Sequence, residues 1–159
     1  MPPKKLPGLL LRILLLPLLL PALPARAADK VGSLTPASNL ALGRFIAAGG
    51  GTVVVSPGGV RSTSGVIPLP GGTISAAAFN RTESGNGKSL RWTTITLPSS
   101  ATLSSGSASM TLNAFTSNPV GTFNGSNLTQ LNVGATLNVS PNQPAGTYTG
   151  TFSVTVNYE

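Results

Sequence analysis

The sequence contains no cysteine and no histidine, and only three acidic residues among 159. Without cysteine an exported domain cannot use disulfides, so its core and its sheet hydrogen bonds have to supply its stability. The two absences also remove the commonest metal ligands and most nucleophile–base pairs. We therefore predict no catalytic, metal or cofactor site, and we expect that the protein is not an enzyme.

The acidic residues are too far apart in the sequence to suggest a catalytic pair. Asp29 and Glu159 lie near the two ends, and Glu83 is the one acid well inside the chain. Glycosidase-type chemistry normally requires two carboxyl groups, so this class is not supported. We expect Glu83 to be solvated near a turn, facing Arg81 or Lys88.

The first 27 residues have the features of a cleaved signal peptide. Lys4 and Lys5 are followed by an apolar run over residues 6–20, and Ala25-Arg26-Ala27 offers small residues at the cleavage spacing. The apolar run is short and broken by proline, which disfavours a stable membrane span. We expect export with cleavage after Ala27.

The charge that remains after cleavage is modest. Residues 28–159 contain six cations and three acids, a formal net charge of +3 against +7 for the whole chain. The cations are scattered, whereas a nucleic-acid binder usually has a dense basic stripe with interleaved aromatics. Nucleic acid is therefore not an expected partner. The six cations are Lys30, Arg44, Arg61, Arg81, Lys88 and Arg91.

The remaining sequence is typical of an all-β domain. Residues 28–38 form a polar lead-in, and residues 39–159 contain short alternating runs separated by Gly, Pro, Asn and Ser. No stretch has a convincing 3.6-residue apolar period. We predict a single domain over 39–159, an immunoglobulin-like antiparallel β-sandwich of about seven to nine short strands, with a barrel as the structural alternative.

The C-terminal residues have the clearest pattern in the chain. Over residues 147–158 every second residue is apolar or glycine and the others are small and polar, which predicts a strand with one buried face. Residues 128–139 alternate in the same way, and a proline-containing turn over 141–145 joins the two runs. The pattern favours a long antiparallel hairpin, and Gly85-Asn86-Gly87 is a second hairpin signal.

Trp92 has a structural and a functional interpretation. It shares its parity with Leu90, whereas Ile95 and Leu97 have the opposite parity, so we predict a β-bulge near Thr93-Thr94. Trp92 then fits a half-buried sheet position, because aromatics favour strands. The functional alternative is an aromatic platform for a sugar.

The C-terminus also resembles a known class of proteins. Tyr158 is penultimate and Gly146 is the fourteenth residue from the end, as is typical of subunits of bacterial fimbriae built by the chaperone–usher route. The resemblance implies that the terminal strand pairs with a periplasmic chaperone and with like subunits. The implied contact residues are Gly146, Tyr148, Phe152, Val154, Val156 and Tyr158.

A closer resemblance covers most of the chain after the signal peptide. It is to an uncharacterised family of exported proteobacterial β-domains, catalogued as a domain of unknown function, and it implies export and a β fold. The segments that carry it are Leu40–Gly43, Gly51–Gly58, Ile95–Pro98, Val133–Leu137 and Gly146–Phe152.

These observations lead to two functional hypotheses. The first is a non-catalytic, fimbria-like structural or adhesive subunit that assembles by β-strand pairing, located in the periplasm in transit and then at the cell surface or outside the cell. The alternative is a self-contained monomeric exported binding module, with carbohydrate near Trp92 as a possible ligand.

Overall fold

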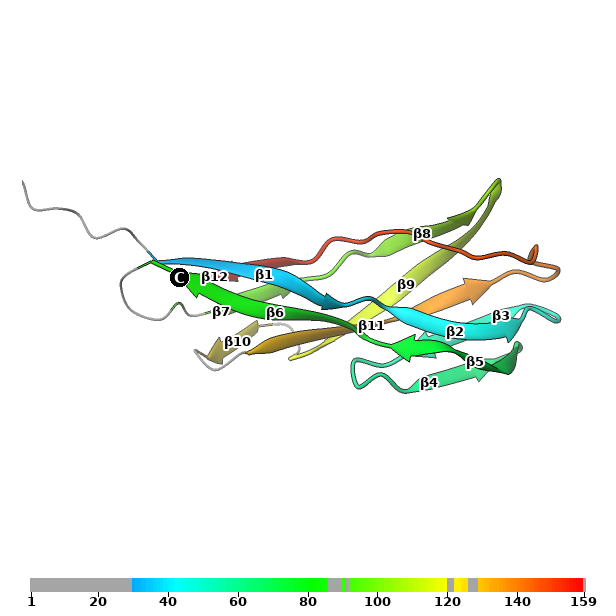
Figure 1. Cartoon of the computed structure of the whole chain (residues 1–159), viewed down its shortest axis with the longest axis horizontal. Helices are drawn as coiled ribbons and strands as arrows, with labels where there is room; N and C mark the ends of the chain where they lie inside the picture. The colour runs from blue at the N-terminus through cyan, green and yellow to red at the C-terminus, as the bar shows by residue number, and fades with distance from the viewer. Residues whose placement is uncertain (1–29, 86–89, 91, 120–121, 126–128, 159) are drawn as a thin grey trace, which may run out of the picture.

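The computed structural model describes residues 30–85, 90, 92–119, 122–125 and 129–158. These residues form an elongated molecule built from strands alone (Figure 1). The strands are β1 (Val31–Ser38), β2 (Ala41–Ile46), β3 (Gly51–Val55), β4 (Arg61–Ser64), β5 (Ile67–Ser75), β6 (Ala77–Ser84), β7 (Trp92–Thr96), β8 (Ser100–Ser105), β9 (Ala108–Asn118), β10 (Thr122–Gly125), β11 (Gln130–Val139) and β12 (Thr155–Tyr158).

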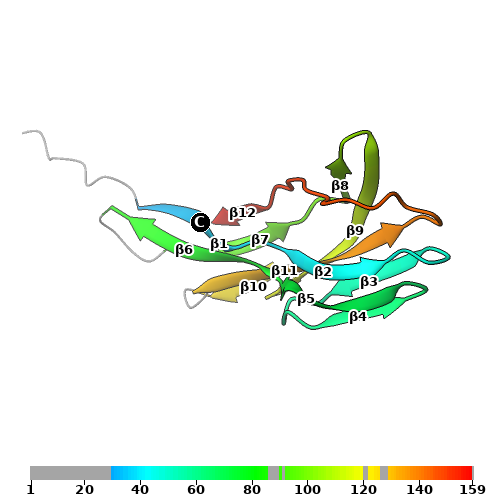
Figure 2. The same cartoon turned by 45° about the vertical axis from the view of Figure 1, so that its right-hand side comes forward.

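All pairings between the strands are antiparallel, and the strands form three sheets. The largest has the order β1-β6-β11-β3-β4, with β9 also paired to β11 and β8 paired to β9. A second sheet has the order β10-β7-β12, and β2 pairs with β5. Figure 2 shows the strands of the large sheet extending from β1 and β6 at one end of the molecule to β3 and β4 toward the other. The predicted all-β antiparallel sandwich is confirmed.

The described residues contain twelve strands, more than the seven to nine that we predicted. Strands such as β5 and β8 lie in stretches without a clear apolar alternation, which makes them hard to recognise from the sequence. β5 contains Pro68 and Pro70, and β8 has the polar sequence Ser-Ala-Thr-Leu-Ser-Ser. β1 coincides with the expected lead-in over residues 28–38, which is therefore part of the sheet from Val31 onward.

The central strand of the core is β11, whose alternation predicted one buried face. Its buried side chains are at most 5% exposed, and its two margins pair with β3 and β6 on one side and with β9 on the other. Burial of such side chains from water is the main stabilising contribution to a domain without disulfides. The buried residues of β11 are Leu131, Val133, Ala135, Leu137 and Val139.

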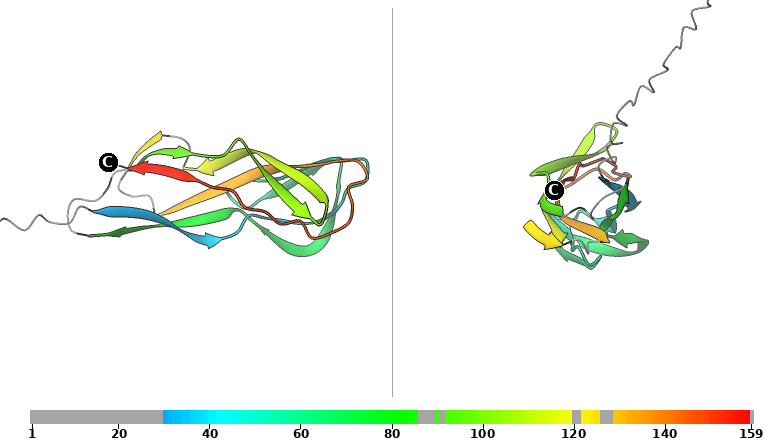
Figure 3. Two further views of the ribbon diagram at one scale, coloured as in Figure 1. Left: turned by 90° about the horizontal axis from the view of Figure 1, so that it is seen from above. Right: turned by 90° about the vertical axis from the view of Figure 1, so that its left-hand side faces the viewer.

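The predicted hairpin between residues 128–139 and 146–158 is wrong. β11 has neighbours on both margins, and β12 pairs with β7 instead. Residues 140–146 carry the chain across the sandwich, so the two alternating runs face one core from opposite layers (Figure 3). Because both arrangements bury every second residue, alternation cannot distinguish them.

The second hairpin signal also does not lead to a paired hairpin. Residues 86 and 87 lie outside the described residues, but the strands on either side of them are described. β6 pairs with β1 and β11, whereas β7 pairs with β10 and β12. The two strands that flank this signal, β6 and β7, therefore belong to different sheets.

Candidate strand-binding groove

One margin of the C-terminal segment, residues 146–158, is attached to the domain. Thr149 and Ser104 of β8 exchange two backbone hydrogen bonds of 2.8 and 3.0 Å, and β12 continues along β7. Within the predicted strand over 146–158, only Thr155–Tyr158 forms a regular ladder of backbone pairs with a neighbouring strand. The opposing strands are interrupted there, because residues 97–99 separate β7 from β8 and Pro98 has no N–H to donate.

Two glycines allow this close approach to β8. A Cβ atom at Gly150 would collide with the carbonyl oxygen of Thr102, and one at Gly146 would collide with the Ser105 hydroxyl. The glycine that the fimbrial resemblance singled out at position 146 therefore has a packing role in this chain. Any larger residue at Gly150 would push the segment away from β8.

The predicted bulge near Thr93 is confirmed. Asn157 pairs with Thr94 and Tyr158 pairs with Trp92, so the ladder skips Thr93. The extra residue changes the parity of β7, as the sequence required. The side chain of Trp92 lies outside the described residues, so the sugar-platform interpretation stays a prediction.

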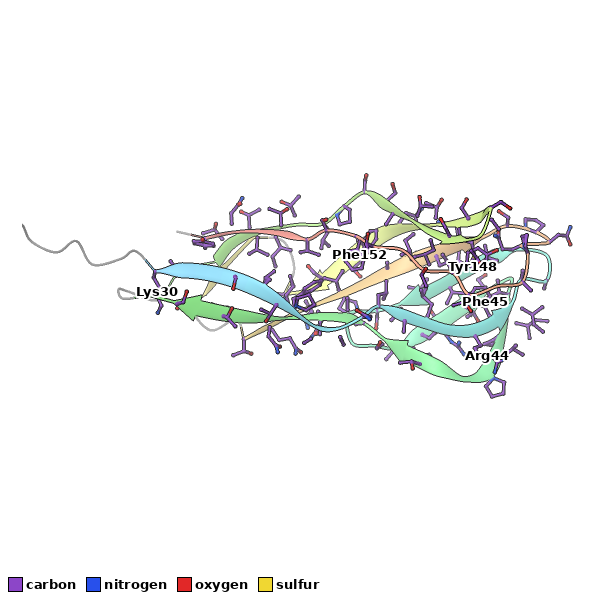
Figure 4. All side chains as sticks on the ribbon, turned by 45° about the horizontal axis from the view of Figure 1, so that its top comes forward. Lys30, Arg44, Phe45, Tyr148 and Phe152 are labelled. Atoms are coloured by element: carbon purple, nitrogen blue, oxygen red, sulfur yellow. The ribbon has the colours of Figure 1, made fainter. Side chains whose placement is uncertain are left out.

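The side chains of the C-terminal segment alternate as predicted, but none of them is fully buried. Tyr148, Phe152, Val154 and Val156 are half-buried against the core, whereas Tyr158 is 41% exposed. The Phe152 ring lies 5.0 Å from that of Phe115 and 6.4 Å from that of Phe79, measured between centroids. Figure 4 shows Tyr148 and Phe152 on this segment.

The second margin of the segment carries unpaired backbone groups. Within the described part of the chain, no backbone hydrogen bond involves residues 150–154. Thr149 directs its own N–H and C=O toward β8, so antiparallel geometry directs those of Tyr148, Gly150 and Phe152 the other way. The segment therefore presents a free strand edge on the side opposite β8.

A groove lies along this free edge. Its second wall is the nearly continuous strand formed by β1 and β2, which pair with β6 and β5 on their other margins. The groove has a volume of about 1470 Å³. Phe45 of β2 and Tyr148 line opposite walls (Figure 4). The apolar floor consists of Ala77, Phe79, Leu103, Met110, Leu112 and Leu137.

The backbone of β2 changes direction at Gly43, which turns two hydrophobic residues toward the same core. The ladder with β5 shifts between Leu42 and Arg44, and Gly43 has a φ of 76°. Arg61 Nη1 donates to the carbonyl oxygens of Leu42 and Arg44 at 3.3 and 3.2 Å. Because the positive φ of Gly43 interrupts the alternation of β2, Leu42 and Phe45 both pack against the core although they are three positions apart.

One end of the groove is held by hydrogen bonds between side chains and backbone. The Tyr148 hydroxyl donates to the Pro144 carbonyl at 2.7 Å, and Gln143 Nε2 donates to the Tyr148 hydroxyl at 2.9 Å. Gln143 Nε2 also donates to the Ser109 carbonyl of β9 at 3.0 Å. These contacts fix the turn over 141–145 and with it the start of the free edge.

The other end of the molecule contains an ion cluster at Glu83. Its carboxylate pairs with Lys30 at 2.6 Å and with Arg81, which confirms one of the two predicted partners. The Glu83 side chain is only 14% exposed, so it is less solvated than we predicted. Burial lowers the pKa of Arg81, which also donates to the Leu90 carbonyl at 2.9 Å. The cluster joins the start of β1 to the end of β6.

Replacing Glu83 with glutamine is expected to lower the free energy of unfolding by about 1–3 kcal/mol, because two partly buried cations lose their common counter-charge. Urea denaturation measures this change. Lys30→Gln is the comparison. We expect it to lower the free energy of unfolding by less, because it leaves the Glu83–Arg81 pair intact. Equal stability of Glu83→Gln and the parent protein would contradict a stabilising role of the cluster.

The groove offers apolar side chains and backbone hydrogen-bonding groups. Among residues that the structure describes, no three of His, Cys, Asp and Glu come together in a metal-binding group. In the same residues, no helix is long and apolar enough to cross a membrane. The groove instead combines an apolar floor with free backbone donors and acceptors on its C-terminal wall.

Of the predicted contact residues, the structure brings Tyr148 and Phe152 into the groove, together with Gly146. Val154 and Val156 pack farther along the same core, and Tyr158 lies at the far end of the segment. The prediction missed the opposite wall over residues 36–48. The sequence signal for this wall was the set of hydrophobic residues Leu40, Leu42 and Phe45. A single sequence does not indicate that these residues face the C-terminal segment.

Comparison with known proteins gives one match. No curated protein and no solved structure matches the chain. A family model described as a domain of unknown function, DUF4402, matches residues 33–158, from the third residue of β1 to the last residue of β12. The match includes both walls of the groove, and the chain therefore belongs to the DUF4402 family.

Proposed function

We propose that this protein is a non-catalytic exported structural or adhesive subunit, fimbria-like in its mode of assembly, that receives a β-strand from another polypeptide in its groove. A periplasmic chaperone in transit and like subunits at the cell surface are the proposed partners. The observation that carries the proposal is the free backbone edge at residues 150–154, lying beside an apolar groove.

An extended peptide can hydrogen-bond to the backbone groups that line this groove, whereas a lipid or another apolar small molecule cannot. A purely apolar ligand would cover the backbone groups of residues 150–154 without bonding them, and each buried unsatisfied group costs about 1–3 kcal/mol. An added strand bonds these groups through its own backbone and places every second side chain on the apolar floor. The half-burial of Phe152 and Val154 is consistent with a wall that a partner completes.

The test is to supply a strand from the protein itself. β12 ends at Tyr158, and Figure 3 shows this end close to the start of β1, at one end of the groove-forming walls. An extension after Glu159 with an Asn-Gly turn and an alternating Thr-Val strand can fold back along the free edge. We expect the extension to block association through the groove and to make the protein more stable by about 3 kcal/mol, with Tm higher by about 10 °C.

The matched control carries aspartate in place of every valine of the extension. It keeps the length and the turn but cannot place its side chains on an apolar floor, so it should leave Tm unchanged. Calorimetry measures Tm, and size-exclusion chromatography of protein from the periplasm measures assembly. If the Thr-Val extension changes neither Tm nor the assembled fraction, the strand-acceptor proposal fails and the self-contained binding module is favoured.

A further inference from the structure

We propose that β1 is exchanged between two copies of this chain, so that β1 of each copy pairs with β6 of the other. This inference concerns the β1–β6 ladder and goes beyond the proposed function, which concerns the free edge of the C-terminal segment. Four features of β1 carry it: its shallow burial, its polar contacts, its position at the edge of a sheet and its junction with β2.

β1 contributes little to the hydrophobic core. Among the β1 side chains that the structure describes, from residue 32 to residue 38, Leu34 is the one that packs against a core cluster, and it is only half-buried. Ser33 and every residue from Thr35 to Ser38 are exposed. The strand is therefore held mainly by its backbone ladder with β6, which spans Val31 to Ser38. Withdrawal of β1 uncovers little apolar surface, so its barrier to exchange is lower than that of a core strand.

The side-chain contacts of β1 with β6 are polar and specific. Ser33 and Thr82 share a hydrogen bond of 2.6 Å, and Thr35 donates to the Asn80 carbonyl at 3.3 Å. The Lys30–Glu83 ion pair holds the start of the strand. A second copy carries the same sequence, so its β1 restores each of these contacts and the same register on β6.

The edge position of β1 makes its withdrawal simple. β1 stands at the end of the strand order β1-β6-β11-β3-β4, so its removal breaks no pairing except that with β6. The exposed edge of β6 is then a ready template for an identical strand. No other strand of the seven-stranded sheet combines an edge position with a location next to the N-terminal residues of the chain.

The junction between β1 and β2 has the features of a hinge. The β1–β6 register shifts between Pro36 and Ser38, and the chain then leaves this sheet for a different one, in which β2 pairs with β5. Asn39 and Leu40 belong to neither strand. Figure 1 shows β1 and β2 following one another along one side of the molecule. A change of backbone angles at residues 37–40 can redirect β1 while β2 stays in place.

The absence of cysteine from the chain allows a direct test with two single variants. Ser33→Cys and Thr82→Cys are co-expressed, exported and oxidised. Ser33 and Thr82 are ladder partners with touching hydroxyl groups, so their cysteines can form a disulfide only when β1 lies on that β6. We expect a covalent species of twice the monomer mass on a non-reducing gel that contains both variants and disappears on reduction.

Three controls make the result decisive. The double variant Ser33→Cys/Thr82→Cys establishes that the pair can be crosslinked at all. Each single variant expressed alone measures chance disulfides between exposed thiols. Ser104→Cys/Ser109→Cys joins β8 to β9, which are connected by a short turn, and should crosslink only within one chain.

The proposal is overturned if the double variant crosslinks entirely as a monomer and the co-expressed single variants give no mixed dimer above the level of each alone. This outcome is independent of the groove, because the Thr-Val extension of the C-terminus can still raise Tm when β1 stays on its own β6. Conversely, a mixed dimer supports exchange of β1 even if the extension has no effect.

Discussion

Replacing Phe152 and Val154 together with aspartate is expected to prevent the domain from folding. Both side chains pack against the core cluster around Leu131 and Val133, and the Phe152 ring also contacts Phe79 and Phe115. The double change removes two hydrophobic contacts and places two carboxylates beside an apolar core, at a total cost of about 4–8 kcal/mol. This is comparable to the whole stability of a typical domain.

The matched control is Thr151→Asp with Ser153→Asp. These residues alternate with the first pair along the same segment but are exposed, so the control adds the same two charges to the outer face. We expect it to fold with the stability of the parent protein within about 0.5 kcal/mol. Circular dichroism and urea denaturation of both double variants measure the difference, and equal stability would contradict the inward orientation of Phe152 and Val154.

This prediction changes how the assembly hypothesis has to be tested. The inward-facing residues of the C-terminal segment contact the protein's own core, so aspartates there disturb folding before they disturb any partner contact. In the proposed assembly, the part that would face a partner is the backbone edge of residues 150–154 and the groove floor beside it. An added strand tests this edge without altering the core, which is why the C-terminal extension is the better experiment.

The second large effect is expected for Gly134→Ala in the centre of β11. A Cβ atom at Gly134 would collide with the carbonyl oxygen of Val55 and would lie 2.8 Å from the backbone nitrogen of Pro57. Backbone atoms cannot move aside as the end of a flexible side chain can, so β3 and β11 have to separate. We expect a loss of about 3 kcal/mol in the free energy of unfolding, measured by urea denaturation.

Gly49→Ala provides the control for this change. No atom lies within 4 Å of a Cβ built at Gly49, so alanine fits there without a clash. We expect its free energy of unfolding to match that of the parent protein or to exceed it slightly, because alanine restricts the unfolded chain. A Gly134→Ala protein as stable as Gly49→Ala would show that β3 and β11 are not in such close contact.

The local patterns of the sequence predicted several features that the structure confirms. The alternation predicted over residues 128–139 and 147–158 correctly placed the apolar side chains of 131–139 and 148–156 on the inner face, although Tyr158 is 41% exposed. The change of parity after Trp92 correctly placed a bulge at Thr93. These predictions succeeded because the pleat of a strand depends on neighbouring residues alone.

Predictions about strand partners failed where the same pattern fits two arrangements. Residues 128–139 and 146–158 were expected to pair with each other, yet they contact one core from opposite layers. The polar residues 31–38 were expected to precede the domain, yet they pair with β6 along its length. Strand pairing uses backbone atoms, which every residue carries, so side-chain patterns identify neighbours only weakly.

By itself, the sequence determined that the described domain is all-β, which faces of its main strands are buried, and that neither cysteine nor histidine is present for chemistry or crosslinks. Only the tertiary structure decided that β1 and β2 lie opposite the C-terminal segment, with an apolar groove between them and a backbone edge left unpaired. The physical reason is that burial follows from the period of neighbouring side chains, whereas a groove depends on which distant strands meet and on how closely their backbones pack.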